Sequence, residues 1–251
     1  MNLGKVVCAL ALFAPAVALL AAQEDPGRKT DTLATSSGDV KIRPIHHASL
    51  MLEWNGIVID VDPWGMERYA GLPKADLILI TDTHGDHLDP KAISAVTKDD
   101  TVIIASEAAA RTVSIARGLA NGKKSDLALA GFTFEVEAVA AYNPTRGPAP
   151  GQFYHPKGRG NGYILALGGR HIYISGDTEC IPEITSLKNI DVAFICMNLP
   201  YTQTPQEAAE CVKKFRPAVV YPYHYRGQDP KVFADALRDE PGIEVRLRNW
   251  Y

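Results

Sequence analysis

One stretch, LILITDTHGDHLDP at residues 77–90, constrains this chain more than any other. An apolar run that is typical of a buried strand ends in three aspartates and two histidines, and the last aspartate is followed by proline. A strand that ends in this way delivers polar side chains to the carboxyl edge of a sheet, where ligand sites of α/β proteins lie. Asp89 and Pro90 mark a helix start, because aspartate caps the first turn and proline tolerates its first position. We therefore predict a strand, a ligand site and a helix in that order.

Short β-rich runs and helical segments follow one another irregularly from residue 40 to residue 251. Strands or hairpins are predicted at residues 40–45, 49–54, 56–62, 76–81, 101–105, 127–142, 162–177, 191–198 and 218–225. Helices are predicted at residues 89–96, 106–120, 204–215 and 229–239, with a last strand or tail at residues 243–251. The third helix is the best marked, because Thr204, Pro205 and Glu207 supply a capping box with proline at its first position. The mixture predicts one α/β domain over residues 40–251.

The beginning of the chain predicts export. Residues 1–22 have the layout of a secretory signal peptide, with Lys5, an apolar run and small residues before the first acids. Pro15 interrupts this run, which is short for a membrane span of about 20 apolar residues, although an uncleaved anchor is the alternative. We expect cleavage near Ala22 and a secreted or periplasmic protein without membrane contact. Residues 23–39 are polar and lack periodicity, so they are predicted to form a flexible leader.

Charge and cysteine content argue against two classes of protein. The formal net charge is −3 and no basic block occurs, so we expect no nucleic-acid partner. After the predicted signal peptide only Cys180, Cys196 and Cys211 remain, which is too few for the disulfide framework of a small secreted protein. At most one bridge can form, and buried free thiols are favoured.

The chemistry is predicted to lie in four side chains at the end of the first stretch: Asp82, His84, Asp86 and His87. Imidazole nitrogens and carboxylate oxygens so close in sequence are the ligands that Zn²⁺, Mn²⁺ and Fe²⁺ require. A polar loop that caps a helix would explain Asp89 but not these four residues. We expect Gly85 to allow a tight turn between them, and we predict a metal site at this edge of the sheet.

The segment D-x-H-x-D-H resembles the H-x-H-x-D-H signature of the metallo-β-lactamase superfamily, most of all in its branch of ascorbate-6-phosphate lactonase-like and other Zn-dependent hydrolases. Four further segments resemble motifs of that family in the same order: HASLMLEWNGIVIDVDP, HPKGRGNGY, YISGDT and YPYHY. The resemblance covers nearly the whole predicted domain, and the ordered set is far more specific than any one motif. It implies an α/β protein with the four-layer αββα sandwich of that superfamily in a single domain.

The resemblance implies two adjacent metal sites. Their ligands would be Asp82, His84 and His155 in one site and Asp86, His87 and His224 in the other, with Asp177 shared by both. His47 and Asp62 match residues that brace or line the site. Independently of the family, His155, Asp177 and His224 each occur in or after a strand end at a turn marked by Gly or Pro, where a side chain can enter a cleft.

Other side chains are candidates for contact with a substrate. Some could donate hydrogen bonds near the site or simply bond at strand ends: Asn198, Tyr201, and Tyr223 or Tyr225. Residues 143–162 form a long loop rich in Pro and Gly, and such loops are either functional or disordered. The cations of this loop, Lys157 and Arg159, would anchor an anionic group of the substrate or face the solvent.

Asp82 departs from the family pattern, which has a histidine at this position. Aspartate also binds these metals, and as a harder, charged ligand it shifts the preference towards Mn²⁺ or Fe²⁺ relative to Zn²⁺. Alternatively the side chain is too short, its site is weak or empty, and only the other site is filled. We favour two divalent ions, Zn²⁺ or Mn²⁺, with Fe²⁺ as a third option.

These residues predict a metal-dependent hydrolase. Two metals ~3.5–4 Å apart hold a hydroxide between them and lower the pKa of bound water to roughly 7. We expect that hydroxide to attack an ester, lactone or phosphoester of a small molecule, with Asp86 or Asp177 as the catalytic proton relay. The alternatives are a hydrolase with one metal site only and a non-catalytic metal-binding domain of the same fold. A strict β-lactamase and a ribonuclease are disfavoured, and the sequence does not predict the oligomeric state.

Overall fold

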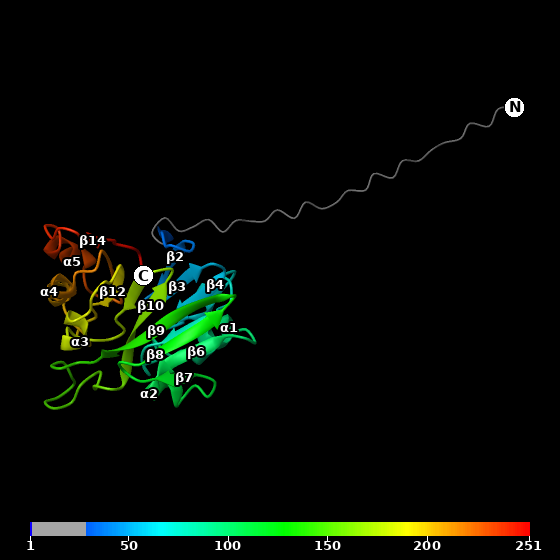
Figure 1. The fold of residues 1–251 in the computed structure, drawn as a ribbon. Helices are drawn as coiled ribbons and strands as arrows, with labels where there is room; N and C mark the ends of the chain where they lie inside the picture. The colour runs from blue at the N-terminus through cyan, green and yellow to red at the C-terminus, as the bar shows by residue number, and fades with distance from the viewer. Residues whose placement is uncertain (2–28) are drawn as a thin grey trace.

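Two seven-stranded β-sheets form the centre of the molecule (Figure 1), and the computed structural model describes Met1 and residues 29–251. In the first sheet the strands lie in the order β1 (Asp31–Leu33), β2 (Val40–His46), β3 (Ser49–Trp54), β4 (Ile57–Val61), β5 (Leu77–Ile80), β6 (Val102–Ser106) and β7 (Arg117–Leu119). In the second sheet the order is β14 (Glu244–Val245), β13 (Val219–Tyr223), β12 (Val192–Cys196), β11 (Arg170–Ile174), β10 (Gly160–Leu167), β9 (Phe132–Ala141) and β8 (Lys124–Leu129). Each half of the chain therefore builds one sheet.

Helices cover the outer face of each sheet. Those on the first sheet are the 3-10 helix η1 (Met66–Tyr69), α1 (Pro90–Val96) and α2 (Glu107–Ala110). Those on the second sheet are α3 (Pro182–Thr185), α4 (Pro205–Phe215) and α5 (Pro230–Ala236). In Figure 1, α3, α4 and α5 lie to the left of the strands, and α1 lies to the right. The predicted fold class, a four-layer αββα sandwich in one domain, is confirmed.

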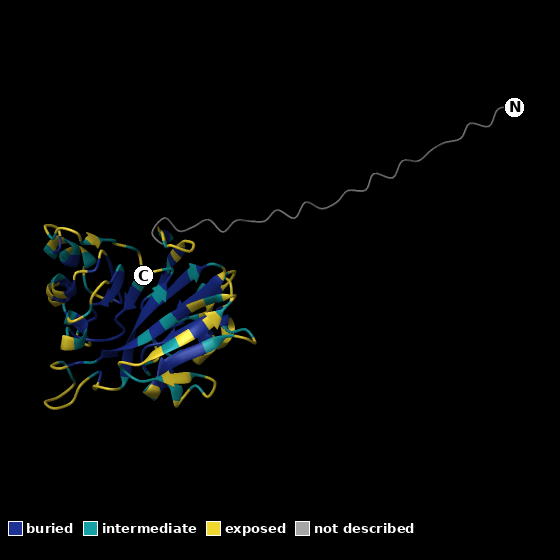
Figure 2. Cartoon of the chain, viewed as in Figure 1, coloured by how far each residue is buried: buried dark blue, intermediate teal, exposed yellow. Residues whose placement is uncertain are grey.

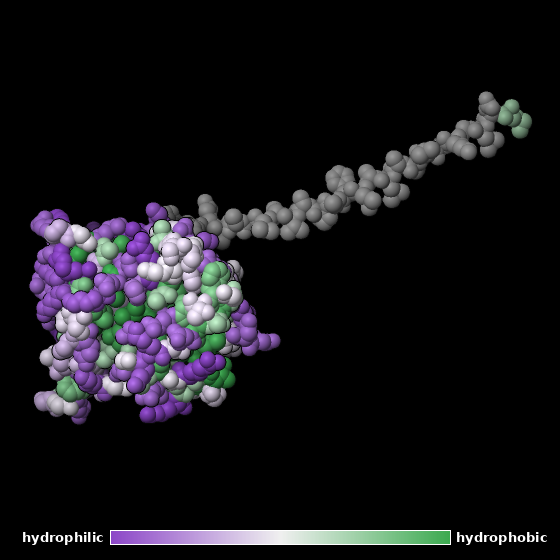
Figure 3. Space-filling view, viewed as in Figure 1, coloured by the Kyte–Doolittle hydropathy of each residue, from purple (hydrophilic) through white to green (hydrophobic). Residues whose placement is uncertain are grey.

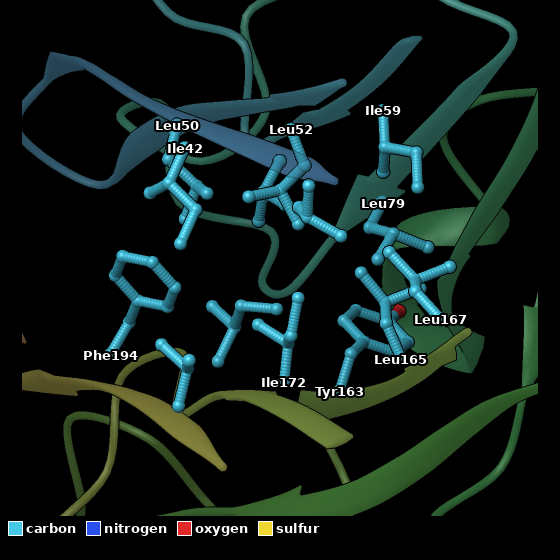
Figure 4. Packing of buried hydrophobic residues seen from close by; sticks show 14 of the residues in the cluster. Ile42, Leu50, Leu52, Ile59, Leu79, Tyr163, Leu165, Leu167, Ile172 and Phe194 are labelled. Carbon is cyan, nitrogen blue, oxygen red and sulfur yellow. The ribbon is translucent and has the colours of Figure 1, made fainter. Parts of the chain in front are cut away.

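The main apolar core lies between the two sheets (Figure 4). Side chains alternate along a strand, so in β4 Ile57 and Ile59 point into this core while Val58 faces the helices. Ile172 and Phe194 close the core from the second sheet. Full burial of one such side chain stabilises the fold by roughly 1.5–3 kcal/mol. Figure 2 shows the same division, with buried residues along the strands and exposed ones in loops and on outer faces.

Parallel strands place several loops at one edge of the sandwich. In the first sheet β4, β5 and β6 run parallel, and in the second sheet β11, β12 and β13 do so. The carboxyl ends of parallel strands lie at the same edge of a sheet, where α/β proteins place their ligand sites. The segments that follow β4, β5, β11, β12 and β13 are therefore the ones that can build a common site.

The helix predicted at residues 106–120 is wrong. Only α2 is helical, and Arg117–Leu119 form β7, which pairs in parallel with β6 at the edge of the first sheet. Gly118 disfavours a helix at this point. Pairing with an open sheet edge overrides the remaining helical pattern, because tertiary context outweighs local propensity.

The flexible leader predicted at residues 23–39 is wrong for residues 31–33, which form β1 against β2. Asp31 is buried, and its carboxylate accepts hydrogen bonds from Arg248 at 2.6 Å and from the Tyr221 hydroxyl at 2.8 Å. An ion pair with a distant part of the chain thus holds this polar segment, which composition alone does not reveal. Except for Met1, the signal peptide predicted at residues 1–22 lies outside the described residues.

Cys180 and Cys211 form a disulfide bond, whereas Cys196 is a buried free thiol. The expectation of three free thiols is therefore wrong, because α4 brings Cys211 beside the segment that follows β11. Closing a loop with a sequence separation of 31 stabilises a fold by about 3–4 kcal/mol in the chain-entropy model.

Within the described part of the chain, no helix has the length and apolar character needed to span a membrane. Figure 3 shows polar residues mainly on the left of the face in view, with apolar residues between them at the centre and on the right.

Candidate metal centre

Side chains with metal-binding donors meet where strands of both sheets end. They are Asp82, His84, Asp86 and His87 after β5, His155 before β10, Asp177 after β11 and His224 after β13. Together with His47 they form three groups, and within each group the ligand atoms lie within 4.8 Å of one another. The groups are His47, Asp86 and His224; Asp82, His84 and His155; and His87, Asp177 and His224. The structure thus brings together all residues predicted as ligands. A Cβ on Gly85 would meet no atom within 4 Å, and Gly85 has no positive φ, so the turn does not require glycine.

Asp177 lies between histidines of both sheets. Its Oδ2 is 3.3 Å from Nε2 of His87 and 3.1 Å from Nε2 of His155. Its Oδ1 is 3.7 Å from Nε2 of His224. Burial alone would raise the pKa of Asp177, but these three histidines hold that pKa well below its usual value. The carboxylate is therefore ionised at the centre of the site.

Asp86 is held by two further contacts. Its Oδ2 is 3.0 Å from Nε2 of His47 and 3.4 Å from Nε2 of His224. The other ring nitrogen of His47 lies 2.7 Å from the Tyr251 hydroxyl, which fixes the orientation of the ring. Burial would raise the pKa of Asp86, but the hydrogen bonds with His224 and His47 lower it far more. A second ionised carboxylate therefore faces the same space.

Two buried residues orient His87. Asp62 Oδ2 is 2.8 Å from Nδ1 of His87, and the Thr81 hydroxyl donates to the same oxygen at 2.6 Å. The Thr81 backbone N–H donates to the other oxygen of Asp62 at 2.7 Å. A carboxylate behind a histidine is the usual means of orienting a metal ligand. The sequence pointed to Asp62 but not to Thr81, because no pattern distinguishes a threonine at the end of a strand.

The long loop between β9 and β10 carries His155 into the buried centre. Asn143 Oδ1 accepts from the backbone N–H of His155 at 2.9 Å and lies 2.6 Å from its Nδ1, so that Nε2 faces Asp177. Glu179 holds the loop, because its carboxylate accepts from the Asn143 amide at 2.9 Å and from the Arg146 backbone at 2.7 Å. Sequence reasoning missed both Asn143 and Glu179. The only available signal was the position of Glu179 two residues after Asp177.

The backbone of the site is strained at several points. Among residues 29–251, seven non-glycine residues have positive φ, and three of them belong to the site: His47 at 57°, Asp62 at 46° and His224 at 47°. Gly176 has a φ of 60°, and a Cβ on it would lie 2.5 Å from the carbonyl oxygen of Asn161, so only glycine fits there. Such conformations persist only where the surrounding structure enforces them, and they cluster at functional sites.

The donor atoms of the centre fit divalent metal ions. Four buried atoms face one another without a hydrogen bond of good geometry: Nε2 of His87, His155 and His224, and Oδ1 of Asp177. A buried polar atom without a partner costs about 1–3 kcal/mol, and coordination to a metal would remove that cost. Burial would lower the pKa of His87, but Asp177 and Asp62 raise it well above its usual value, so this position attracts positive charge. Imidazole and carboxylate donors together suit Zn²⁺ or Mn²⁺.

The Asp82 side of the centre contains an arginine. Nη2 of Arg159 is 3.0 Å from Asp82 Oδ2 and 3.1 Å from His84 Nε2. The other oxygen of Asp82 accepts hydrogen bonds from the backbone and hydroxyl of Thr83. Burial would raise the pKa of Asp82, but His87 and Arg159 lower it. Arg159 is therefore partly buried and paired with Asp82 and His84, a contact that the sequence did not indicate.

The centre opens into a cleft of about 670 Å³, and two of the predicted substrate contacts, Asn198 and Tyr201, line it together with His47. Tyr223 does not, because it is buried in the core and its hydroxyl accepts from the backbone of Gly176 at 3.1 Å. Lys157 is exposed and pairs with Glu183 at 2.9 Å, away from the cleft. The predictions of substrate contact for Tyr223 and Lys157 are therefore wrong.

Two residues that the sequence did not single out also line the cleft: Tyr154 and Arg226. Tyr154 packs edge-on against Tyr201 with ring centroids 5.0 Å apart. Arg226 follows His224 by two residues and is exposed. Its position in the YPYHYRG segment was the available signal, because residues just after a ligand-bearing strand lie at the mouth of the site.

A family model described as "Beta-lactamase superfamily domain" matches residues 41–224, which is most of the chain and includes every predicted ligand. The chain belongs to the metallo-β-lactamase superfamily. The resemblance first seen in D-x-H-x-D-H is thereby confirmed at the level of the superfamily. The αββα sandwich described above is the fold of this superfamily.

Several relatives in the metallo-β-lactamase superfamily match nearly end to end. A UPF0173 metal-dependent hydrolase from Thermococcus kodakarensis is 29% identical over 83% of this chain and 100% of its own length. One from Thermus thermophilus is 28% identical, with 82% and 94% covered. A crystal structure from Parabacteroides distasonis, described as a metal-dependent hydrolase, has a TM-score of 0.80 at 46% identity and covers 88% of this chain and 98% of its own. Igni18, a metallo hydrolase from Ignicoccus hospitalis, has a TM-score of 0.70 at 23% identity, with 84% and 95% covered, and shows the fold alone.

The relatives do not support the predicted export of this protein. The Thermococcus kodakarensis relative is covered completely by 83% of this chain, so the remaining part of this chain has no counterpart in it. The Thermus thermophilus relative is 94% covered by 82% of this chain, so it too leaves part of this chain unmatched. The prediction of a secreted or periplasmic protein has no support from these relatives and is not retained.

Proposed function

We propose that this protein is a metal-dependent hydrolase that cleaves an ester, lactone or phosphoester bond of a small molecule. The observation that carries the proposal is the convergence of three histidine nitrogens, from His87, His155 and His224, on Asp177 beside an open cleft. Membership of the metallo-β-lactamase superfamily and the names of the relatives support metal-dependent hydrolysis.

We propose two divalent ions, Zn²⁺ or Mn²⁺, with Fe²⁺ as a third option. The proposed holders are His87, Asp177, His224 and Asp86 for one ion, and Asp82, His84, His155 and the shared Asp177 for the other. When bound, such ions lower the pKa of a coordinated water to roughly 7 and polarise a carbonyl or phosphoryl oxygen. Asp62 and Asn143 keep the ligand rings of His87 and His155 in place through their second nitrogens.

Asp86 and Asp177 are the residues that we propose as catalytic. Their neighbours hold both pKa values low, so both carboxylates are acceptors at neutral pH. A carboxylate with a low pKa accepts a hydrogen bond from a water molecule but binds a proton only weakly. We therefore expect these two residues to orient water, and to act as proton relays only briefly. His47 fixes Asp86 from behind at 3.0 Å, so little reorganisation is needed during the reaction.

The cleft suggests the kind of substrate. Arg226 supplies a cation at its wall, and Tyr154 and Tyr201 supply aromatic surface. Asn198 is 6% exposed and offers an amide to the same space. Polar groups placed in this way fix the orientation of a ligand in a small-molecule site. We therefore propose a substrate with a polar or anionic group that reaches Arg226.

A screen of lactones, phosphodiesters and carboxylic esters tests this function, with protein loaded with Zn²⁺ or Mn²⁺. We expect turnover of at least one class by the wild type and by the Lys157→Gln variant, whose change lies outside the cleft. Asp177→Asn should lower kcat by on the order of 100-fold or more, since even outer-shell partners of a metal contribute ~10- to 100-fold. A folded, metal-loaded wild type that hydrolyses none of the three classes would contradict the proposal.

A further inference from the structure

Arg159 lies on the atoms that Asp82 and His84 would offer to a metal. Its Nη2 is 3.0 Å from Asp82 Oδ2 and 3.1 Å from His84 Nε2, so one guanidinium group contacts both donors. The side chains of Asp82 and Arg159 are 2% and 22% exposed, so the ion pair is largely shielded from water. The next residue, Gly160, also lies beside Asp82, since a Cβ at that position would lie 3.4 Å from Asp82 Oδ2. The contact is therefore built into the start of β10.

A guanidinium group cannot share these donors with a metal. It stays protonated at all relevant pH values, has five N–H donors and no acceptor, and repels another cation. A metal that binds Asp82 and His84 must displace Arg159 from both of them. Conversely, the buried carboxylate of Asp82 needs a cation, because removing one partner of a buried ion pair leaves a costly uncompensated charge.

The other side of the centre has no such internal cation among the described residues. The Nε2 atoms of His87 and His224 and the Oδ1 atom of Asp177 lack hydrogen bonds of good geometry, and no arginine or lysine pairs with this group. A metal can bind there by displacing protons from the histidines, without displacing an arginine or lysine side chain. The two neighbouring sites therefore present different costs to the same ion.

We propose that Arg159 competes with the second metal ion, so that the sites fill in a fixed order. The first divalent ion binds tightly at His87, Asp177 and His224. The second binds at Asp82, His84 and His155 only when Arg159 moves away, and therefore more weakly. This inference rests on the metal binding in the proposed function but not on hydrolysis. Arg159 acts here as a built-in substitute for one metal charge.

Metal titration of chelator-stripped protein tests the order of filling. We would titrate Zn²⁺ and Mn²⁺ by calorimetry and count bound ions by elemental analysis after equilibrium dialysis, with circular dichroism to confirm the fold. The wild type should show a tight first step and a second step weaker by about tenfold or more, the scale of outer-shell effects on metal affinity. Arg159→Gln should strengthen the second step by a similar factor and change the first step much less.

Three further variants keep the test specific. Arg159→Lys retains the charge and should leave the second step weak. Lys157→Gln removes a cation from the same loop, and Arg226→Gln removes one from the cleft wall, and neither contacts Asp82. Neither of these two should strengthen the second step as Arg159→Gln does.

Equal affinities at both sites of the wild type would overturn the proposal. So would an unchanged second step in Arg159→Gln, or an equal gain in Lys157→Gln or Arg226→Gln, which would indicate general electrostatics. If the wild type binds a single ion, Arg159→Gln must gain a second one. Ordered filling in a protein without any hydrolytic activity would defeat the proposed function and leave this inference intact.

Discussion

His84 and His87 leave the same strand three residues apart, yet they meet opposite surroundings. His87 is fully buried and has Asp62 behind its ring and Asp177 in front of it. His84 is only partly buried and faces the guanidinium group of Arg159. One side of the centre therefore has no arginine or lysine among the described residues, whereas the other contains Arg159. Similar donors therefore do not make equivalent metal sites, because the charged side chain beside the donors determines what a metal must displace.

The largest expected effect separates His87→Ala from His84→Ala. His87→Ala removes a ligand of the tight site, so we expect loss of the first ion and a fall in kcat of more than about 100-fold, beyond the range of outer-shell changes. His84→Ala should keep close to one bound ion per chain and a larger residual activity. Elemental analysis and steady-state kinetics measure both. Equal losses of metal in the two variants would break the comparison.

A smaller effect is expected from the residues that orient the ligands. Thr81→Val removes a hydroxyl that donates to Asp62 behind His87, so it should weaken the first metal step by about 10- to 100-fold. Asn143→Ala removes the acceptor that orients His155, so it should weaken the second step by a similar factor. Calorimetric titration distinguishes the two steps, and thermal melts control for damage to the fold. If both variants weaken the same step, the assignment of these residues to separate sites fails.

Asp60 shows what burial alone does to the pKa of a carboxyl group, because no cation is paired with it among the described residues. Both of its oxygens lack hydrogen-bond partners, and burial raises its pKa to about 8 from 3.8. Between these values the unfolded chain loses the proton while the folded chain keeps it, so stability falls as the pH rises. Relative to Asp60→Asn, the free energy of unfolding of the wild type should fall by about 1.4 kcal/mol per pH unit between about pH 4 and pH 8.

Urea unfolding at several pH values, with matched metal content, measures this slope. A flat difference between the wild type and Asp60→Asn would mean that Asp60 is ionised or hydrated in the folded protein. In that case burial alone would not keep a carboxyl group protonated in this protein. The low pKa values of the carboxylates in the centre would then no longer require their cationic partners.

The parts of the fold that follow local rules could be predicted from the sequence. Thr204 and Glu207 form the expected capping box of α4, and Asp89 caps α1 through the backbone N–H groups of Lys91 and Ala92. Each of these signals lies within four residues of the bond that it predicts. The helix expected at residues 106–120 failed because its end folds back as β7 and pairs with β6, the strand that directly precedes it.

The site divides in the same way. The ligand-bearing segments could be named because each joins a strand end to histidine or aspartate, and the structure brings those side chains together. Their supports could not be named, because Asn143, Glu179 and Arg159 act through the path of a long loop that no local pattern determines. The charge balance around Asp82 was hidden for the same reason, since its partner lies 77 residues away.

The ligands come from both sheets, with Asp82 to His87 from the first and His155, Asp177 and His224 from the second. A metal bound by these residues would cross-link the two halves of the chain, which otherwise contact each other mainly through apolar packing. Because an unfolded chain offers no such cage, each ion would add folding stability of about 2.7 kcal/mol at a free concentration 100 times its Kd. The lifetime of the protein in a cell would then depend on the local supply of metal as well as on its own sequence.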